Sequence, residues 1–295
     1  MPTSRAVLLL GMHRSGTSAV ARGLGALSVY LGNDFLDAQP ENPTGYWEDK
    51  RIVALNERLL GALKLRWDDT ALIDRRAFER RRVRALERDA VRYLNRTFTS
   101  SPLWGFKDPR TIRVLPFWQE ILRECAVADC YVVAIRNPRS VAASLFARQA
   151  MDADAAYRLW LVHMVPFFND VIDKPFVVVD YDLLMRDPRT QLARIGRRLE
   201  IPFETGSGEI DRFDSGFLDA SLRHSVFEPD DFDDDSAVGR LTRDAYLRLY
   251  ELATDKAAGP GSSLASDWAE FQARLSLILE PQAKPRSWLL RFLES

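Results

Sequence analysis

The chain is poor in the residues from which metal centres and disulfide scaffolds are built. Its 295 residues include two cysteines and three histidines. Cys125 and Cys130 are not accompanied by a His/Cys cluster at metal-ligand spacing, so we expect no zinc site. Because no disulfide framework is apparent, we interpret the two thiols as reduced core residues of a cytoplasmic protein.

The sequence also lacks a long apolar run and an excess of charge. The apolar segment at residues 6–10 is too short to cross a bilayer, and no signal-peptide cleavage pattern follows it, so we predict no membrane span. The 41 Lys and Arg residues face 42 Asp and Glu residues, which gives a net charge of −1. This balance produces no global field that would attract nucleic acid, and we expect no nucleic-acid partner.

What the chain does contain is a hydrophobic fraction of 46%, enough for a sizeable core. Short apolar segments that read as buried strands occur at residues 6–10, 104–106, 131–135 and 176–179. Helical patterns occur between and after them, at residues 17–27, 51–63, 75–96, 115–125, 157–172, 189–199 and 241–253. This alternation predicts an α/β fold with a central parallel sheet flanked by helices. We expect a single domain over residues 1–295, less regular and partly helical from about residue 205.

The most informative segment follows the first predicted strand and reads Gly11-Met-His-Arg-Ser-Gly-Thr-Ser18. A strand, a glycine turn and a helix N-terminus form a cradle for an anion, because backbone N–H groups and the helix dipole both favour a phosphate. The spacing from Gly11 to Gly16 is that of a nucleotide-triphosphate loop. The lysine of such a loop is missing, since Thr17 stands in its place, and a cation lies inside the loop at Arg14.

A second informative segment follows the strand predicted at residues 131–135 and reads Arg136-Asn-Pro-Arg-Ser-Val-Ala-Ala-Ser144. Its proline suits the first turn of a helix, and Ser140 and Ser144 would share one helix face. A third segment, residues 177–184, combines a strand pattern with Tyr-Asp-Leu-Leu and is followed by Asp-Pro.

These three segments resemble, in the same order, the 5′-phosphosulfate loop, the 3′-phosphate motif and the late Tyr-x-x-Leu-Leu segment of sulfotransferases. The resemblance is to the single-domain bacterial type that uses 3′-phosphoadenosine 5′-phosphosulfate (PAPS). It implies a P-loop nucleotide-hydrolase-like fold, PAPS as co-substrate, adenosine 3′,5′-bisphosphate (PAP) as product, and no metal requirement. The residues that the resemblance assigns to the nucleotide are Arg14, Ser15, Gly16, Thr17, Ser18, Arg136 and Ser144, with Arg223 as a further candidate.

The resemblance also suggests which residue removes the acceptor's proton. Gly45-Tyr-Trp-Glu-Asp49 is similar to the segment that carries a glutamate base in the tyrosylprotein and heparan sulfate N-sulfotransferase branches, which makes Glu48 the candidate general base. A carboxylate beside a tryptophan would be partly desolvated, which raises its pKa. Two alternatives stay open: Glu48 serves only as a charge at a helix N-terminus, or Asp49 is the base.

Two cations complete the predicted catalytic set. Arg14 would stabilise the leaving group, and Lys107, within Lys-Asp-Pro-Arg, matches the second catalytic lysine of the tyrosylprotein branch. The alternative for Lys107 is an ion pair with Asp108 in a turn. Because Gly11, Lys107 and Arg136 each follow a predicted strand, they should converge at the carboxyl ends of the sheet. We expect His13 to point away from the cradle and His163 to be a structural core residue.

The predicted function is transfer of a sulfuryl group from PAPS to a hydroxyl or amine of an unidentified acceptor, such as a carbohydrate or another metabolite. A P-loop kinase and a non-catalytic PAP-binding protein are the alternatives. Nine arginines in residues 75–96 form either a solvated helix face or a docking surface for an anionic acceptor. The short amphipathic segment at residues 287–293 would pack on the domain or in an oligomer contact. The sequence predicts no oligomeric state.

Overall fold

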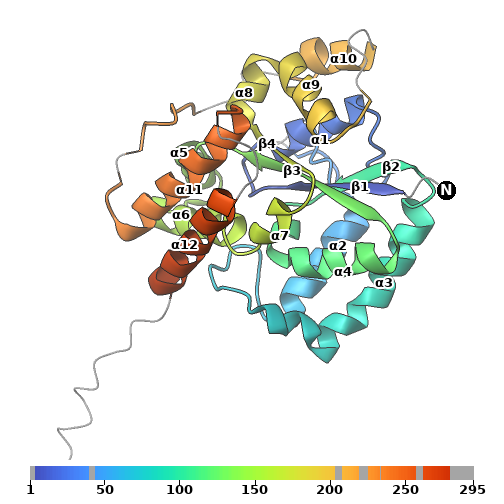
Figure 1. Cartoon of the computed structure of the whole chain (residues 1–295), viewed down its shortest axis with the longest axis horizontal. Coiled ribbons are helices and arrows are strands. Elements are labelled where there is room, and N and C mark those ends of the chain that lie inside the picture. The colour runs from blue at the N-terminus through green and yellow to red at the C-terminus, as the bar shows by residue number, and fades with distance from the viewer. Residues whose placement is uncertain are drawn as a thin grey trace, which may run out of the picture.

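Four parallel strands form the centre of the part of the chain that the structure describes (Figure 1). This computed structural model describes residues 4–39, 44–202, 208–218, 225–232, 234–256 and 262–279. The strands are β1 (Arg5–Leu10), β2 (Leu103–Lys107), β3 (Ala128–Ile135) and β4 (Phe176–Asp180), in the order β2-β1-β3-β4. Arg5 lies opposite both Leu103 and Ala128, and all three strand pairs are parallel. The predicted α/β fold with a central parallel sheet is therefore confirmed.

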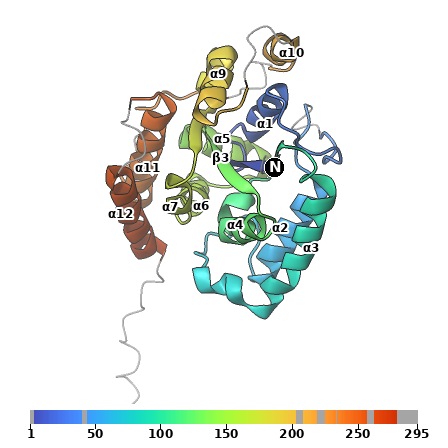
Figure 2. The same cartoon turned by 45° about the vertical axis from the view of Figure 1, so that its right-hand side comes forward.

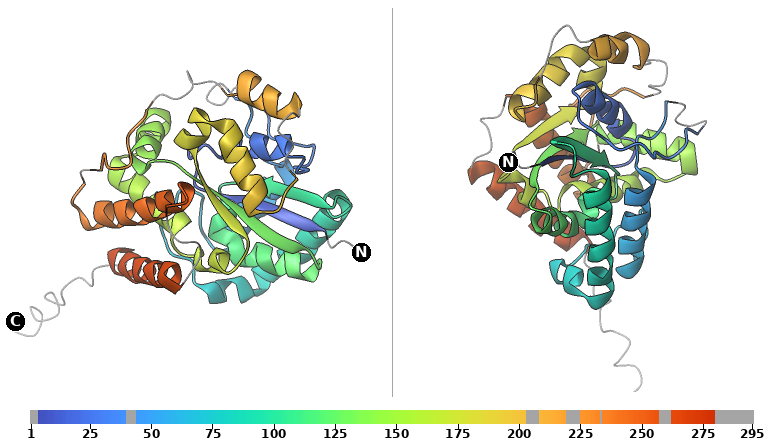
Figure 3. Two further views of the ribbon diagram at one scale, coloured as in Figure 1. Left: turned by 45° about the horizontal axis from the view of Figure 1, so that its top comes forward. Right: turned by 90° about the vertical axis from the view of Figure 1, so that its right-hand side faces the viewer.

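Helices cover both faces of this sheet (Figures 1 and 2). On one face lie α1 (Thr17–Ala26), α8 (Tyr181–Arg186), α9 (Pro188–Arg198) and α10 (Gly208–Gly216). The other face and its flank are covered by α2 (Lys50–Ala62), α3 (Arg81–Thr97), α4 (Leu115–Glu124), α5 (Pro138–Gln149), α6 (Ala153–Met164), α7 (Asn169–Ile172), α11 (Ala237–Ala253) and α12 (Ser262–Leu279). Two short 3-10 helices, η1 (Arg75–Glu79) and η2 (Thr111–Val114), precede α3 and α4. Figure 3 shows the same layers from two further directions.

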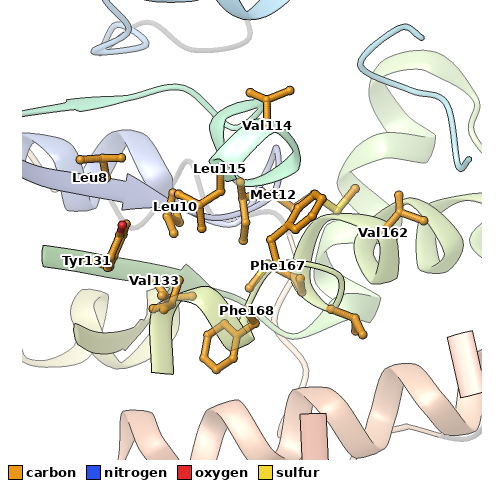
Figure 4. Packing of buried hydrophobic residues seen from close by; sticks show 14 of the residues in the cluster. Leu8, Leu10, Met12, Val114, Leu115, Tyr131, Val133, Val162, Phe167 and Phe168 are labelled. Atoms are coloured by element: carbon orange, nitrogen blue, oxygen red, sulfur yellow. The ribbon is translucent and has the colours of Figure 1, made fainter. Parts of the chain in front are cut away.

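The apolar runs of the strands explain this layering. Successive residues of a strand point to opposite faces, so a strand buried on both sides reads as a continuous apolar run. In β1, Val7 and Leu9 join the core under α1 and α9, whereas Leu8 and Leu10 join the larger core on the other side. Figure 4 shows this larger core, in which Leu8 and Leu10 of β1 lie near Tyr131 and Val133 of β3, and Phe167 and Phe168 close it from the loop before α7.

Three predicted elements differ in the structure. Residues 75–96 form two helices, because Arg80 adopts an extended conformation between η1 and α3. Residues 157–172 are interrupted between α6 and α7 at a segment containing Pro166, whose nitrogen cannot donate a helical hydrogen bond. The third difference is α12, which begins at Ser262 and has no counterpart among the helical patterns that the sequence predicts. Its buried stripe of Leu264, Trp268, Phe271 and Leu275 has helical spacing and could have been found.

Candidate functional site

The loop between β1 and α1 is shaped by two glycines. Gly11 and Gly16 both have positive φ, at 145° and 75°. A Cβ atom at Gly11 would strike the carbonyl oxygen of Ala134 in β3, and one at Gly16 would collide with the ring of Tyr181. Gly16 is the N-cap of α1 and provides no side-chain cap, so the first turn of this helix opens towards the loop. The glycine positions therefore create the close backbone approach that an anion cradle requires.

A cavity of about 710 Å³ lies at the carboxyl ends of the strands. This is within the size range of small-molecule sites, roughly 300–1,000 Å³. Of the residues predicted from the sequence, those that line it are Arg14, Gly16, Thr17, Ser18, Glu48, Lys107, Arg136 and Ser144. Ser15 is buried and is not among the lining residues. Arg223 lies outside the residues that the structure describes. The structure thus brings together residues from segments as distant in the sequence as the loop after β1 and helix α5.

The two predicted phosphate sites are in direct contact. Arg14 lies in the loop after β1 with a φ of 68°, and its Nε donates a hydrogen bond to Ser144 Oγ in α5 at 2.8 Å. The guanidinium of Arg136, which follows β3, lies 4.9 Å from the centre of the Tyr181 ring and donates to the carbonyl oxygen of Ser225. Ser140, one turn before Ser144, has a buried hydroxyl without a hydrogen-bond partner among the described residues.

On another wall of the cavity, Lys107 and Glu48 form a buried ion pair. Lys107 Nζ donates to Glu48 Oε1 at 2.6 Å, to the Tyr46 carbonyl at 2.9 Å and to Ser18 Oγ at 3.4 Å. These three contacts use all three N–H donors of the ammonium group. Burial raises the pKa of Glu48, and the attraction of Lys107 only partly opposes this. The alternative in which Lys107 pairs with Asp108 is wrong, because the Asp108 carboxylate instead accepts from Asn56 and Arg110.

Comparison with known proteins shows the family of the chain. Residues 6–205 match the model of the sulfotransferase family. The chain belongs to the sulfotransferase family. That match begins in β1 and extends through the loop, Glu48, Lys107, Arg136 and Ser144. No curated protein matches the chain significantly.

Solved structures with a similar course of the chain include other sulfotransferases. A sulfotransferase domain from a Synechococcus olefin synthase is 19% identical, with 88% of this chain and 97% of that one covered and a TM-score of 0.43. A Mycobacterium tuberculosis sulfotransferase is 12% identical, with coverages of 83% and 76% and a TM-score of 0.40. Retinol dehydratase in a complex with retinol and PAP is 10% identical, with coverages of 95% and 83% and a TM-score of 0.32. The family assignment rests on the family model and not on these distant likenesses.

Within the sulfotransferase, Asp49 has a structural task that separates it from Glu48. One oxygen of its carboxylate accepts the backbone N–H groups of Arg51 and Ile52 at 3.0 Å each, which caps α2. The other oxygen accepts the Tyr93 hydroxyl at 2.6 Å. Both oxygens of Asp49 are thereby engaged, whereas Glu48 is not the cap of the helix and lines the cavity.

The orientation of the His13 side chain is set by two aromatic rings. His13 is among the residues that line the cavity, but its ring packs 4.6 Å from that of Trp67 and 6.1 Å from that of His163, neither of which lines the cavity. The ring packs on the loop after α2, which the local sequence around residue 13 does not reveal. Burial lowers the pKa of His13 well below its usual value. His163 is buried in α6 with its Nδ1 2.7 Å from the Leu159 carbonyl oxygen, and burial lowers its pKa to about 3, which fits the predicted structural role.

Among the described residues, no three His, Cys, Asp or Glu side chains are grouped so that they could hold a metal ion. None of the helices described in the structure combines the length and the apolar composition needed to cross a membrane.

Proposed function

We propose that this sulfotransferase uses PAPS as its donor and transfers the sulfuryl group to a hydroxyl or amine, with Glu48 as the general base. The observation that carries the proposal is the shared cavity. A glycine-shaped helix N-terminus, two arginines and a buried Lys107–Glu48 pair all line it. A donor with a phosphosulfate and a separate 3′-phosphate requires two anion sites, and the helix N-terminus and the two arginines support the assignment of both to this cavity.

The residues present fit such a donor. The hydroxyl of Ser140, which lines the cavity, is buried without a hydrogen-bond partner among the described residues, as expected of a group that serves a ligand. Arg14 and Ser18 would hold the phosphosulfate at the start of α1. Arg136 and Ser144 would hold the 3′-phosphate. The apolar side chains of Met185, Phe217 and Leu218 also line the cavity and offer a surface for a flat base.

When bound, PAPS would supply an SO3 group on a phosphate oxygen. The sulfur–oxygen bond to the phosphate would break, a bond to the acceptor oxygen or nitrogen would form, and the acceptor's proton would move to Glu48 and then to solvent. The protein positions the reactants and stabilises charge, by analogy with phosphoryl transfer. Arg14 and Lys107 would face the charge that grows on the leaving oxygen and the sulfuryl group. Of the three Lys107 contacts, that with Ser18 Oγ is the longest.

The donor site is tested by comparing the affinities of PAP and 5′-AMP by calorimetry. A charge-assisted contact to the 3′-phosphate contributes about 1.5–3 kcal/mol, so PAP should bind about 10- to 100-fold more tightly. Arg136→Gln should remove most of this difference and leave the affinity for 5′-AMP near that of the wild type. Equal wild-type affinities for the two nucleotides would contradict the proposal.

The transfer reaction is tested with 35S-labelled PAPS and fractionated cell extract, followed by identification of labelled products. Transfer should persist in EDTA, because the proposed chemistry requires no divalent ion. Turnover of ATP that EDTA abolishes and Mg²⁺ restores would indicate a kinase instead. Tight PAP binding without labelled product from any fraction would favour a non-catalytic nucleotide-binding protein.

A further inference from the structure

A buried polar network lies behind the Lys107–Glu48 pair and includes Arg110. The two oxygens of Glu48 face different cations. Oε1 accepts from Lys107, whereas Oε2 lies 3.8 Å from Nη1 of Arg110. The side chain of Arg110 is 13% exposed, and the same Nη1 donates to Asp108 Oδ1 at 2.8 Å. Arg110 therefore bridges the carboxylates of Glu48 and Asp108.

The Asp108 end of this bridge is rigidly held. Asp108 is fully buried, and its Oδ1 also accepts the backbone N–H of Arg110 at 3.0 Å. Its Oδ2 accepts from Asn56 Nδ2 of α2 at 2.9 Å. Asn56 in turn donates to Thr111 Oγ1 and accepts the indole N–H of Trp118 in α4. The network thus connects Arg110 to two helices, and it leaves the guanidinium little freedom to move.

The charges of the network suggest why Glu48 needs two cations. Lys107 is proposed to contact the transferred sulfuryl group, so part of its attraction for Glu48 is withdrawn during the reaction. A buried carboxylate without a partner is costly and takes up a proton from solvent instead. Arg110 does not line the cavity wall with Lys107, and it is tied to Asp108. It can therefore keep Glu48 charged and oriented while Lys107 acts elsewhere.

We propose that Arg110, held by Asp108 and Asn56, is a positioning residue that orients the Glu48 carboxylate and tunes its basicity. This inference rests on the proposed function, in which Glu48 is the base. The charged groups around Glu48 act with known signs: burial raises its pKa most, Asp108 raises it too, and Lys107 and Arg110 lower it. The adjacent Asp49 carboxylate is engaged at the N-terminus of α2.

The test is a 13C NMR titration of the Glu48 side-chain carboxyl in the full-length protein labelled with 13C-glutamate, with E48Q used to assign the signal. R110Q removes a cation next to Glu48, so its titration midpoint should move to higher pH. D108N removes an anion, so the midpoint should move to lower pH. A purely structural role predicts no such opposite movement, because both substitutions would only loosen the same network. R110K retains the charge, so its titration midpoint should lie between those of R110Q and the wild type.

E57Q is the matched control, because Glu57 also contacts Arg110, at 3.4 Å, but its side chain is 61% exposed. It should leave the midpoint nearly unchanged. PAP affinity should be unchanged in every variant, which shows that the fold and the nucleotide site are intact. An unaltered midpoint in folded R110Q, or movement in the same direction in R110Q and D108N, would overturn the inference. If R110Q does not fold, D108N decides alone, because a midpoint that stays in place or moves to higher pH in D108N would overturn the inference.

This result is independent of the proposed function, because the midpoint is measured without turnover. Sulfuryl transfer that persists in E48Q would show that Glu48 is not the base, whatever the titration gives. If Glu48 is the base, the acid limb of the pH–rate profile should follow the NMR midpoint, towards higher pH in R110Q and lower pH in D108N. An acid limb that stays at the same pH while the NMR midpoint moves would show that Glu48 is not the base, although Arg110 still tunes its basicity.

Discussion

Replacing Lys107 by Met should turn the Glu48 carboxylate into a destabilising buried charge. Lys107 is 2% exposed and Glu48 is 5% exposed, and their charged atoms lie 2.6 Å apart. Met keeps most of the apolar stem and removes the ammonium, so the carboxylate retains only Arg110 at 3.8 Å. Removing one partner of a buried ion pair costs about 3–5 kcal/mol of unfolding free energy, and we expect the lower end because Arg110 remains.

The size of this loss should depend on pH, because Glu48 can take up a proton. Burial raises its pKa in the folded protein above the value in the unfolded chain, and removing Lys107 raises it further. A carboxyl group with a raised folded pKa contributes stability that is fully present below its unfolded pKa and is lost as the pH rises through its folded pKa. The deficit of K107M should therefore be smallest at the acid end of the range in which the protein stays folded and should grow as the pH rises.

Urea denaturation of the wild type, K107M, E48Q and the double variant across this pH range measures the effect. In the double variant both charges are gone, so its deficit should be smaller than that of K107M and should not grow as the pH rises. Burial raises the pKa of Asp180 to about 7, but this group titrates in all four proteins and cancels in the differences. A K107M deficit that is the same at every pH, or single-variant losses that simply add, would refute the reasoning.

Three further predictions concern the proposed site. Glu48→Gln should lower kcat about 100- to 10,000-fold with unchanged PAP affinity. Asp49→Asn should keep turnover, because Asn caps a helix nearly as well as Asp. The reverse pattern would make Asp49 the base. Arg14→Ala should lower both the turnover and the PAP affinity measured by calorimetry, since the charge of Arg14 faces the donor before and during transfer. An unaltered affinity would place Arg14 outside the donor site. Gly16→Ala should abolish detectable PAP binding through collision with Tyr181 and the positive φ, and a bound, active variant would show that this loop is not the cradle.

The sequence predicted those parts of the site that are local to a strand end. Gly16 and Arg136 belong to strand–turn–helix segments whose chemistry can be read from a few adjacent residues. Parallel strands bring their carboxyl ends to one edge, so the convergence of these segments followed from the fold class alone. Glu48 was predicted by resemblance only, and its position in the cavity depends on the long loop before α2.

The remaining features depend on contacts between distant segments, which local patterns do not contain. Asn56 and Asp108 are 52 residues apart, and Asn56 and Trp118 are 62 apart, yet they form one network. Asn56 lies in the predicted helix at residues 51–63, where a polar residue on the apolar face gave no signal about its partner. The orientation of His13 likewise depends on Trp67, which lies in an irregular segment after α2.

His13 and Glu48 both line the cavity, and their surroundings decide which of them is suited to be the base. A general base is most effective when its pKa lies near the working pH. Burial lowers the pKa of His13, and the nearby Arg110 and Lys107 act in the same direction, so its imidazole is a poor proton acceptor. Burial moves the pKa of Glu48 in the opposite direction. Proton transfer to Glu48 would also neutralise the partner of Lys107 and leave the ammonium free to stabilise the charge that develops in transfer. A pH–rate profile whose ionisation disappears in H13Q and persists in E48Q would instead identify His13 as the base.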